Sequence, residues 1–198
     1  RCCRRQRQMC IRDRARSRRS RLLPAEAYNQ LLNLEHAEIA RYIQDLEYRR
    51  EIDRYGSTLS GADLIETALV DNLAKDVGDF LSFSKGKLRD ILHVYAEKYR
   101  IENLKNIVRG INQNMDKQNL ERLVCPINDS DKELYNKLYD SKTVEDMISS
   151  LEGTSYYNPL KKALEARNSD SLQPLEDALD SVSHTHLRAH ETSHHRVC

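Results

Sequence analysis

The chain has 198 residues and a formal net charge of +1, with 32 Lys and Arg residues against 31 Asp and Glu. The near-neutral sum hides an acidic body, because residues 22–181 hold 20 Lys and Arg against 29 Asp and Glu. An acidic body argues against nucleic acid or anionic lipid as the main partner. No run of about 18 apolar residues occurs, so the sequence predicts no membrane-spanning helix.

The two ends of the chain resemble translated sequencing-adapter sequence, one from each strand of the adapter. The similar stretches are residues 7–14 (RQMCIRDR) and 182–192 (VSHTHLRAHET). We therefore interpret residues 1–21, with a native start near residues 15–20, and residues 182–198 as artefactual, and the chain as truncated. Without these ends Cys125 is the only cysteine, which favours a reducing, cytoplasmic setting and excludes a thiolate metal site.

Apolar residues recur at three- and four-residue spacing through the first half of the body, a pattern typical of α-helices. Pro24 suits the first turn of a helix whose apolar side carries Tyr28, Leu31 and Leu32. Ser84 is placed to cap a later helix. The helices predicted in this half cover residues 24–34, 39–48, 63–80 and 85–99.

The most regular amphipathic stretch follows at residues 95–110 (YAEKYRIENLKNIVRG). Its apolar face is formed by Ile101, Leu104, Ile107, Val108 and Ile111. The opposite, polar face carries Glu102, Lys105, Asn106 and Arg109, with Asn103 on the margin. Gly110 is expected to loosen or end the helix. The stretch therefore predicts a packing helix with a polar back and no catalytic constellation.

Helices resume after a polar loop at residues 112–119 and a break at residues 125–128. They are predicted over residues 134–139, 143–151, from 158 onward, and 172–179, with Thr143 as a cap and Gly153 closing the second. No convincing strand pattern occurs anywhere in the body. The sequence therefore predicts an all-α fold.

A weak internal repeat recurs at a separation of roughly 105–110 residues. Residues 38–69 and 144–179 each run from a helix through a tyrosine and a spacer to a second helix. The second helices contain LIETAL at residues 64–69 and LEDAL at residues 175–179. We therefore divide the body into two helical units, residues 22–112 and a truncated second unit at residues 113–181.

The residues that could carry chemistry form no catalytic pattern. Cys125 is expected to be a small buried hydrophobe, and His36 and His93 are isolated. Residues 84–87 (SKGK) lack the spacing of a phosphate-binding loop. Histidines with metal-binding spacing lie in the adapter-like end: His184, His186, His190, His194 and His195. No catalytic residue, cofactor site or metal site is therefore predicted.

Two stretches stand out as motifs: Ile101-x-Asn103-Leu104-Lys105-x-Ile107-x-Arg109-Gly110 and LIETAL at residues 64–69, with looser matches at residues 20–28 and 46–48. Together they resemble the C-type (AC39) family of archaeal-type and bacterial V-type rotary ATP synthases, which is related to the d-type protein of eukaryotic V-ATPases. The resemblance implies a funnel-shaped, threefold helical repeat, of which this chain would hold the first unit and most of the second. It also implies structural or subunit-contact roles for Asn103, Leu104, Lys105, Arg109 and Gly110.

Arg109 has two interpretations. In the first, its guanidinium makes a forked contact to a carboxylate on a neighbouring helix or subunit. In the second, it is a solvated charge on the back of an amphipathic helix. The spacing alone favours the second, and the family resemblance makes the two about equal.

The resemblance further implies a non-catalytic central-stalk adaptor that couples proton or sodium translocation to ATP synthesis or hydrolysis. Its partners would be the membrane rotor ring and the central-stalk subunits. It would lie peripherally, on the cytoplasmic face of the membrane, held by the ring rather than by insertion. Two other classes stay open: a free-standing helical-repeat module that binds another protein, and an enzyme that uses carboxylates converging in a cleft.

Overall fold

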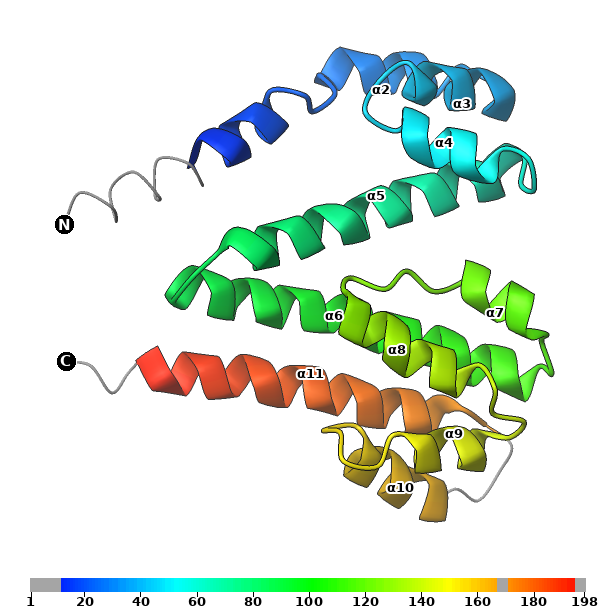
Figure 1. Ribbon diagram of the computed structural model, residues 1–198, viewed down its shortest axis with the longest axis vertical. Helices are drawn as coiled ribbons and strands as arrows, with labels where there is room; N and C mark the ends of the chain where they lie inside the picture. The colour runs from blue at the N-terminus through cyan, green and yellow to red at the C-terminus, as the bar shows by residue number, and fades with distance from the viewer. Residues whose placement is uncertain (1–11, 167–170, 195–198) are drawn as a thin grey trace. The chain divides into compact units, whose positions relative to one another are not determined.

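The computed structural model describes residues 12–166 and 171–194, with side chains up to Ser183. Every regular element in these residues is a helix, which confirms the predicted all-α class (Figure 1). The chain separates into two compact units, one ending at Asp76 and one beginning at Val77. The boundary lies inside α5 (Gly61–Phe83). The division at residues 112 and 113, which follows from the internal repeat, stays a prediction.

The first unit has a small core between short helices and the first part of α5. These helices are α2 (Ala25–Leu31), α3 (His36–Gln44) and α4 (Arg49–Tyr55). A capping box formed by the side chains of Glu35 and Glu38 fixes the start of α3. The buried residues of the core are Ile43, Ile52, Leu64 and Ala68.

The first unit differs from the prediction at α2. The helix ends at Leu31 because the backbone tightens into turns in which Asn33 and Leu34 donate to carbonyls three residues earlier. The predicted apolar side is not the buried one, since Tyr28 and Leu32 are exposed and Ala27 is buried. The predicted helix at residues 39–48 is likewise divided, and α4 follows as a separate helix.

Two ion pairs join the arginine-rich start of the chain to later parts of the first unit. Arg18, in a helical stretch at residues 12–19, pairs with Asp76 of α5. Arg21 pairs with Glu47, in the turn before α4. These contacts anchor residues that the sequence interpretation assigned mainly to an artefact, and that interpretation stays a prediction.

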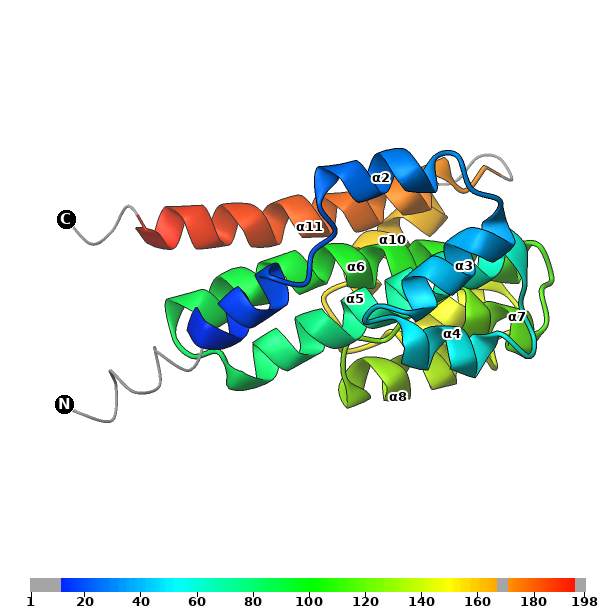
Figure 2. The ribbon, with the colours of Figure 1, turned by 90° about the horizontal axis from the view of Figure 1, so that it is seen from above.

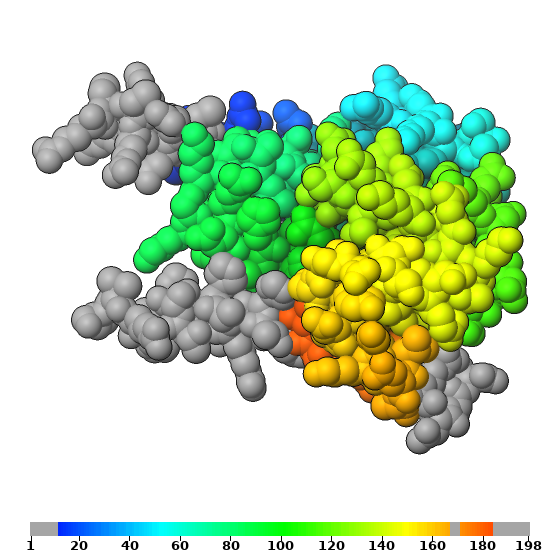
Figure 3. Space-filling model, turned by 60° about the horizontal axis from the view of Figure 1, so that its bottom comes forward, coloured from blue at the N-terminus to red at the C-terminus, as the bar shows by residue number. Residues whose placement is uncertain are grey.

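The second unit is organised around α6 (Lys87–Asn112). The later helices are α7 (Lys117–Arg122), α8 (Asp129–Leu138), α9 (Val144–Ser150), α10 (Tyr157–Glu165) and α11 (Gln173–His194). Helices α6 and α11 lie side by side (Figure 2), and α6 also packs against α9. Helices α8 to α10 form a continuous surface (Figure 3). The core contains, among others, Ile101, Leu104, Ile107, Val108, Leu138, Met147, Leu151, Leu160, Leu175 and Leu179.

Helix α6 corrects the prediction of two successive helices at residues 85–99 and 95–110, because it is one continuous helix of 26 residues. Gly86 precedes it with φ 59°, a left-handed conformation that favours glycine. Ser84 therefore does not cap the helix. Its hydroxyl is buried and has no hydrogen-bond partner among the described residues.

Gly110 lies inside α6 and does not end it. The helix closes two residues later in a Schellman-type arrangement, in which Met115 N–H donates to the Gly110 carbonyl at 2.9 Å. Asn114, with φ 54°, takes the left-handed position of this motif. The turn chemistry that sequence reasoning assigned to Gly110 therefore belongs to Asn114.

The remaining helices follow the prediction in part. Thr143 caps α9 as predicted, since the Asp146 N–H donates to its hydroxyl at 3.1 Å. Helix α7 begins inside the predicted loop at residues 112–119, capped by Asp116. Helix α11 continues to His194, beyond the predicted helical stretch, and Val182 belongs to the buried core.

Candidate functional site

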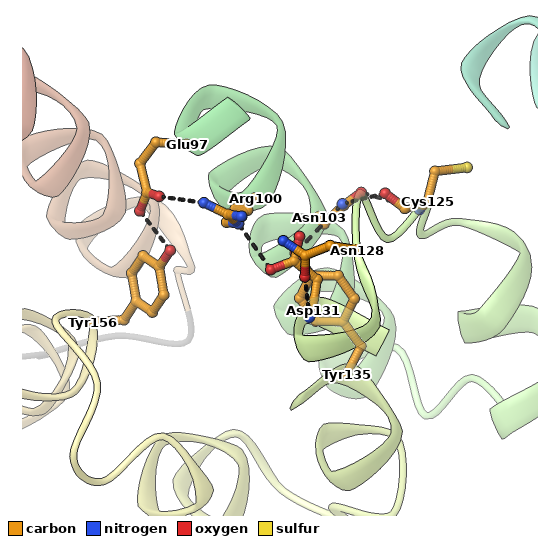
Figure 4. A network of polar contacts seen from close by, with 8 residues as sticks. All are labelled: Glu97, Arg100, Asn103, Cys125, Asn128, Asp131, Tyr135 and Tyr156. Carbon is orange, nitrogen blue, oxygen red and sulfur yellow. Dashed lines mark hydrogen bonds and ion pairs between the residues drawn. The ribbon is translucent and has the colours of Figure 1, made fainter. Parts of the chain in front are cut away.

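The polar groups of the second unit gather along α6, where they tie this helix to its neighbours. The first group, the Arg100 cluster, consists of Glu97, Arg100, Asp131 and Tyr156 (Figure 4). Arg100 Nε donates to Asp131 Oδ1 at 2.8 Å, and Nη1 donates to Glu97 Oε2 at 3.3 Å. The Tyr156 hydroxyl donates to Glu97 Oε1 at 2.5 Å. The cluster therefore joins α6 to α8 and to the residue that precedes α10.

Burial gives the Arg100 cluster its electrostatic character. Burial is the largest single influence on the Arg100 pKa and lowers it, but Asp131 and Glu97 together outweigh it and raise the pKa. Arg100 thus keeps its charge in a mostly buried position. The pKa of Tyr156 is raised, first by burial and then by its hydrogen bond to Glu97. Both hydrogen-bonding partners of Glu97 therefore act as donors at neutral pH.

Asn103 holds the segment between α7 and α8 against α6. Its Nδ2 donates to the Cys125 carbonyl at 2.9 Å, and its Oδ1 accepts from the Cys125 N–H at 3.3 Å. One side chain thus satisfies both backbone groups of a residue outside any helix, as Figure 4 shows. Three residues further on, the Asn128 side chain caps α8 by accepting from the Asp131 N–H at 2.8 Å. The positions of the segment and of Asp131 are therefore linked.

The second group, the α11 ladder, consists of Lys105 and Arg109 on α6 with Asp180 and Glu176 on α11. Lys105 Nζ lies 2.7 Å from Asp180 Oδ1, and Arg109 forms two hydrogen bonds of 2.8 Å to the two oxygens of Glu176. The hydrogen bond from Arg109 is the main cause of a lowered Glu176 pKa. For Lys105, burial lowers the pKa, but Asp180 and Glu102 raise it more.

The family-motif residues predicted from sequence therefore lie in three different settings. Leu104 belongs to the apolar core, and Asn103 clamps Cys125. Lys105 corrects the prediction of a solvated polar back, because only 7% of its surface is exposed and α11 covers it. Arg109 makes the forked contact, to a helix of the same chain.

Gly110 permits the close approach of α7 to α6. A Cβ atom at this position would lie 2.2 Å from Leu120 Cδ2 and 3.3 Å from Met115 Sδ. Leu120 is itself almost fully buried. Glycine is therefore required here by packing and not by a turn.

Neither group contains a nucleophile or a set of metal ligands. No cluster of three or more metal-ligating side chains occurs in the part of the chain that the structure describes. None of its described helices is long and apolar enough to cross a membrane. Cys125 is half-buried and not buried as predicted, and burial lowers the pKa of the half-buried His93. The side chains of the C-terminal histidines lie outside the described residues.

Sequence reasoning missed the partners that α6 meets. Arg100, Asp131 and Tyr156 gave no signal, because their spacing along the chain follows no helical period. The Glu97–Arg100 spacing of three residues could have indicated a pair on one helix face. Glu176 lies in the repeated segment LEDAL, but the repeat alone does not indicate a charge partner.

Fold and site together define an all-helical protein whose described polar side chains serve helix packing. Comparison with known proteins identifies the family. Residues 14–195 match the family model of the ATP synthase (C/AC39) subunit. The chain belongs to this family.

Three relatives illustrate the similarity, and each is named as the C-type subunit of an A-type ATP synthase. The protein of Haloferax volcanii is 35% identical over 175 residues, covering 88% of this chain and 50% of the relative. That of Archaeoglobus fulgidus is 34% identical over 174 residues, covering 88% and 49%. That of Methanosarcina acetivorans is 32% identical over 176 residues, covering 89% and 48%. The chain thus spans about half the length of the curated relatives it matches.

Proposed function

We propose that this chain acts as part of a non-catalytic adaptor that links the membrane rotor ring to the central stalk of a rotary ATP synthase. In this role it couples proton or sodium translocation to ATP synthesis or hydrolysis. The observation that carries the proposal is the family match along residues 14–195, together with relatives named as C-type subunits of A-type ATP synthases. The partners are the ring and central-stalk subunits.

The geometry of α6 supports a mechanical role. A subunit that transmits torque must keep its helices in register under load. In the second unit the Arg100 cluster, Asn103 and the α11 ladder tie α6 to three other segments through directional, partly buried contacts. Such contacts resist sliding better than apolar packing alone, because they lose their geometry when the helices shift.

An enzymatic role has little support in the described residues. A catalytic carboxylate commonly shows a shifted pKa in a cleft. Among the described carboxylates a shift is resolved for Glu176 alone, and its hydrogen bond to Arg109 accounts for the lowered value. This ion pair stabilises the fold without requiring a substrate.

The attachment to the membrane would be peripheral, at the cytoplasmic face and through the rotor ring. The acidic body disfavours direct binding to anionic lipid, since like charges repel. The ring would therefore provide the contact, with the central stalk on the opposite side of the adaptor.

The proposal is tested by binding to purified central-stalk subunits and detergent-solubilised rotor ring of the Haloferax volcanii enzyme. We expect the chain to co-elute with at least one of them in size-exclusion chromatography, without ATP hydrolysis of its own. The matched control is Leu104→Asp, which places a charge in the core and should abolish binding by unfolding. A folded, monodisperse chain that binds neither component would refute the adaptor and favour the free-standing protein-binding module.

A further inference from the structure

An open apolar groove lies in the first unit, between α3 and α5. It has a volume of about 420 Å³. Leu69 and Val70 on its wall are 38% and 40% exposed, and Leu73 is 39% exposed one turn further along α5. The groove is lined by His36, Ile39, Ala62, Ile65, Glu66, Leu69 and Val70.

The internal repeat relates this groove to a filled one in the second unit. The order α3, α4, α5 corresponds to the order α9, α10, α11. Aligning LIETAL with LEDAL at their last leucines pairs Leu69 with Leu179. Ile65, Glu66 and Val70 then correspond to Leu175, Glu176 and Asp180.

In the second unit, α6 covers these corresponding residues. Helix α6 packs against both α9 and α11. Leu175 and Leu179 are fully buried in the core that α6 shares. Glu176 and Asp180 hold Arg109 and Lys105 in the α11 ladder. All four residues at the corresponding positions thus meet α6.

In the first unit the same positions are uncovered. Among the described residues, no ion pair involves Glu66, which is exposed at the groove. Leu69 is partly exposed where its counterpart Leu179 is fully buried. The groove thus has the apolar wall and the carboxylate of the α11 surface, without the helix that covers them.

We propose that this groove docks an amphipathic helix of the α6 type, supplied from outside these 198 residues. Its apolar residues, spaced by three and four, cover Ile65 and Leu69, and an arginine forks onto Glu66 as Arg109 does onto Glu176. Val70 replaces the acidic Asp180, so the helix carries an apolar residue in place of Lys105. The groove docks this helix whether or not the protein works in a rotor.

The probe is a fluorescently labelled peptide with the sequence of residues 95–112 of this chain. Fluorescence anisotropy should show saturable binding to the full chain, and circular dichroism should show a gain in helix, because a free peptide of this length is only marginally helical. Leu69→Asp should weaken binding about tenfold or more, since it places a charge in the apolar contact. The control Leu123→Asp changes a leucine that is 45% exposed in the second unit, and should leave binding unchanged.

A charge exchange tests the orientation of the helix. Glu66→Lys should weaken binding of the unaltered peptide about tenfold. A peptide carrying Arg109→Glu should bind the Glu66→Lys protein better than it binds the unaltered protein. A peptide carrying Lys105→Leu should bind the unaltered protein more tightly than the original peptide, because it matches Val70.

Three outcomes would overturn the proposal. One is equal binding to the Leu69→Asp and Leu123→Asp proteins, which would indicate nonspecific apolar attraction. Another is binding that does not respond to the charge exchange. The third is a chain that excludes the peptide but self-associates in sedimentation until Leu69→Asp makes it monomeric, which would show that a second copy occupies the groove.

Discussion

Arg109 and Glu176, 67 residues apart in sequence, form a two-pronged ion pair between α6 and α11, with both hydrogen bonds 2.8 Å long. Arg109 is 44% exposed at its side chain, and Glu176 only 18%. The pair is therefore partly shielded from solvent on its acidic side. It fixes the position of α11 along α6, because a fork loses both bonds when either helix shifts.

Replacing Arg109 should weaken the second unit in a graded way. Arg109→Ala is expected to lower the free energy of unfolding by about 1 kcal/mol, a moderate value because water screens the exposed guanidinium. Arg109→Lys should lose less, since an ammonium keeps the charge but cannot fork. Urea denaturation followed by circular dichroism measures both changes.

The control for Arg109 is the exposed ion pair between Lys117 and Asp140. Lys117→Ala removes an ion pair of similar length on the surface, and should leave the denaturation midpoint nearly unchanged. If Arg109→Ala changed stability no more than Lys117→Ala, the fork would not hold the helices together.

The Arg109–Glu176 pair should also make stability depend on pH. The pKa of Glu176 is lowered from 4.5 in the folded chain, chiefly by the hydrogen bond from Arg109. A lowered pKa means that the folded state binds the proton less readily than the unfolded state. The stabilisation is therefore complete above pH 4.5 and is lost as the pH falls through the lower folded-state value.

This pH dependence can be measured by comparing the chain with Glu176→Gln. The variant should be less stable at neutral pH, and the difference should shrink as the pH falls below 4.5. Denaturant titrations at several pH values, from about 3 to about 7, span the titration of carboxylates and supply the measurement. A stability difference that stays constant across this range would contradict the assignment.

Gly110 offers a test in which the sign of an effect should reverse. Gly110→Ala improves helix propensity but places a methyl group against the buried Leu120 side chain. We expect a net loss of about 1 kcal/mol, because overpacking outweighs the propensity gain. In a Leu120→Ala background the obstructing atom is gone, and Gly110→Ala should become stabilising. Thermal denaturation of the four proteins forms a double-mutant cycle.

The apolar face of α6 could be predicted from sequence, and its polar contacts could not. Periodicity identifies Ile101, Leu104 and Ile107 because burial repeats with the turn of the helix. The same reasoning misplaced Lys105, since a lysine can bury its stem when an acid such as Asp180 receives its amine. The position of that acid depends on how α11 folds back, which no local pattern encodes.

Local chemistry gave mixed results for the same reason. The capping of α9 by Thr143 could be predicted because donor and acceptor lie three residues apart. Gly110 was misassigned because a glycine near a helix end also suits a turn, and the approach of Leu120 is a tertiary contact. The adapter interpretation of the two ends rests on sequence similarity and stays a prediction.

Asn103 and Asn106 provide a matched pair on one helix. Asn103 is buried and satisfies both backbone groups of Cys125, whereas Asn106 makes one hydrogen bond, at 3.1 Å, to the Leu123 carbonyl at an exposed site. Asn103→Ala should cost about 2 kcal/mol, because two backbone groups lose their partners away from water. Asn106→Ala should cost about 0.5 kcal/mol or less, because water can replace its bond.

Hydrogen exchange shows where the loss occurs. In the Asn103→Ala chain the Cys125 amide should exchange faster, and so should the amides at the start of α8, because Asn128 and Asp131 depend on the same segment. In the Asn106→Ala chain these amides should keep their protection. Equal stability losses in the two variants, with no local change at Cys125, would mean that Asn103 contributes only bulk packing. A local change confined to the Asn103 variant would instead identify a single side chain that orders the connection between α7 and α8.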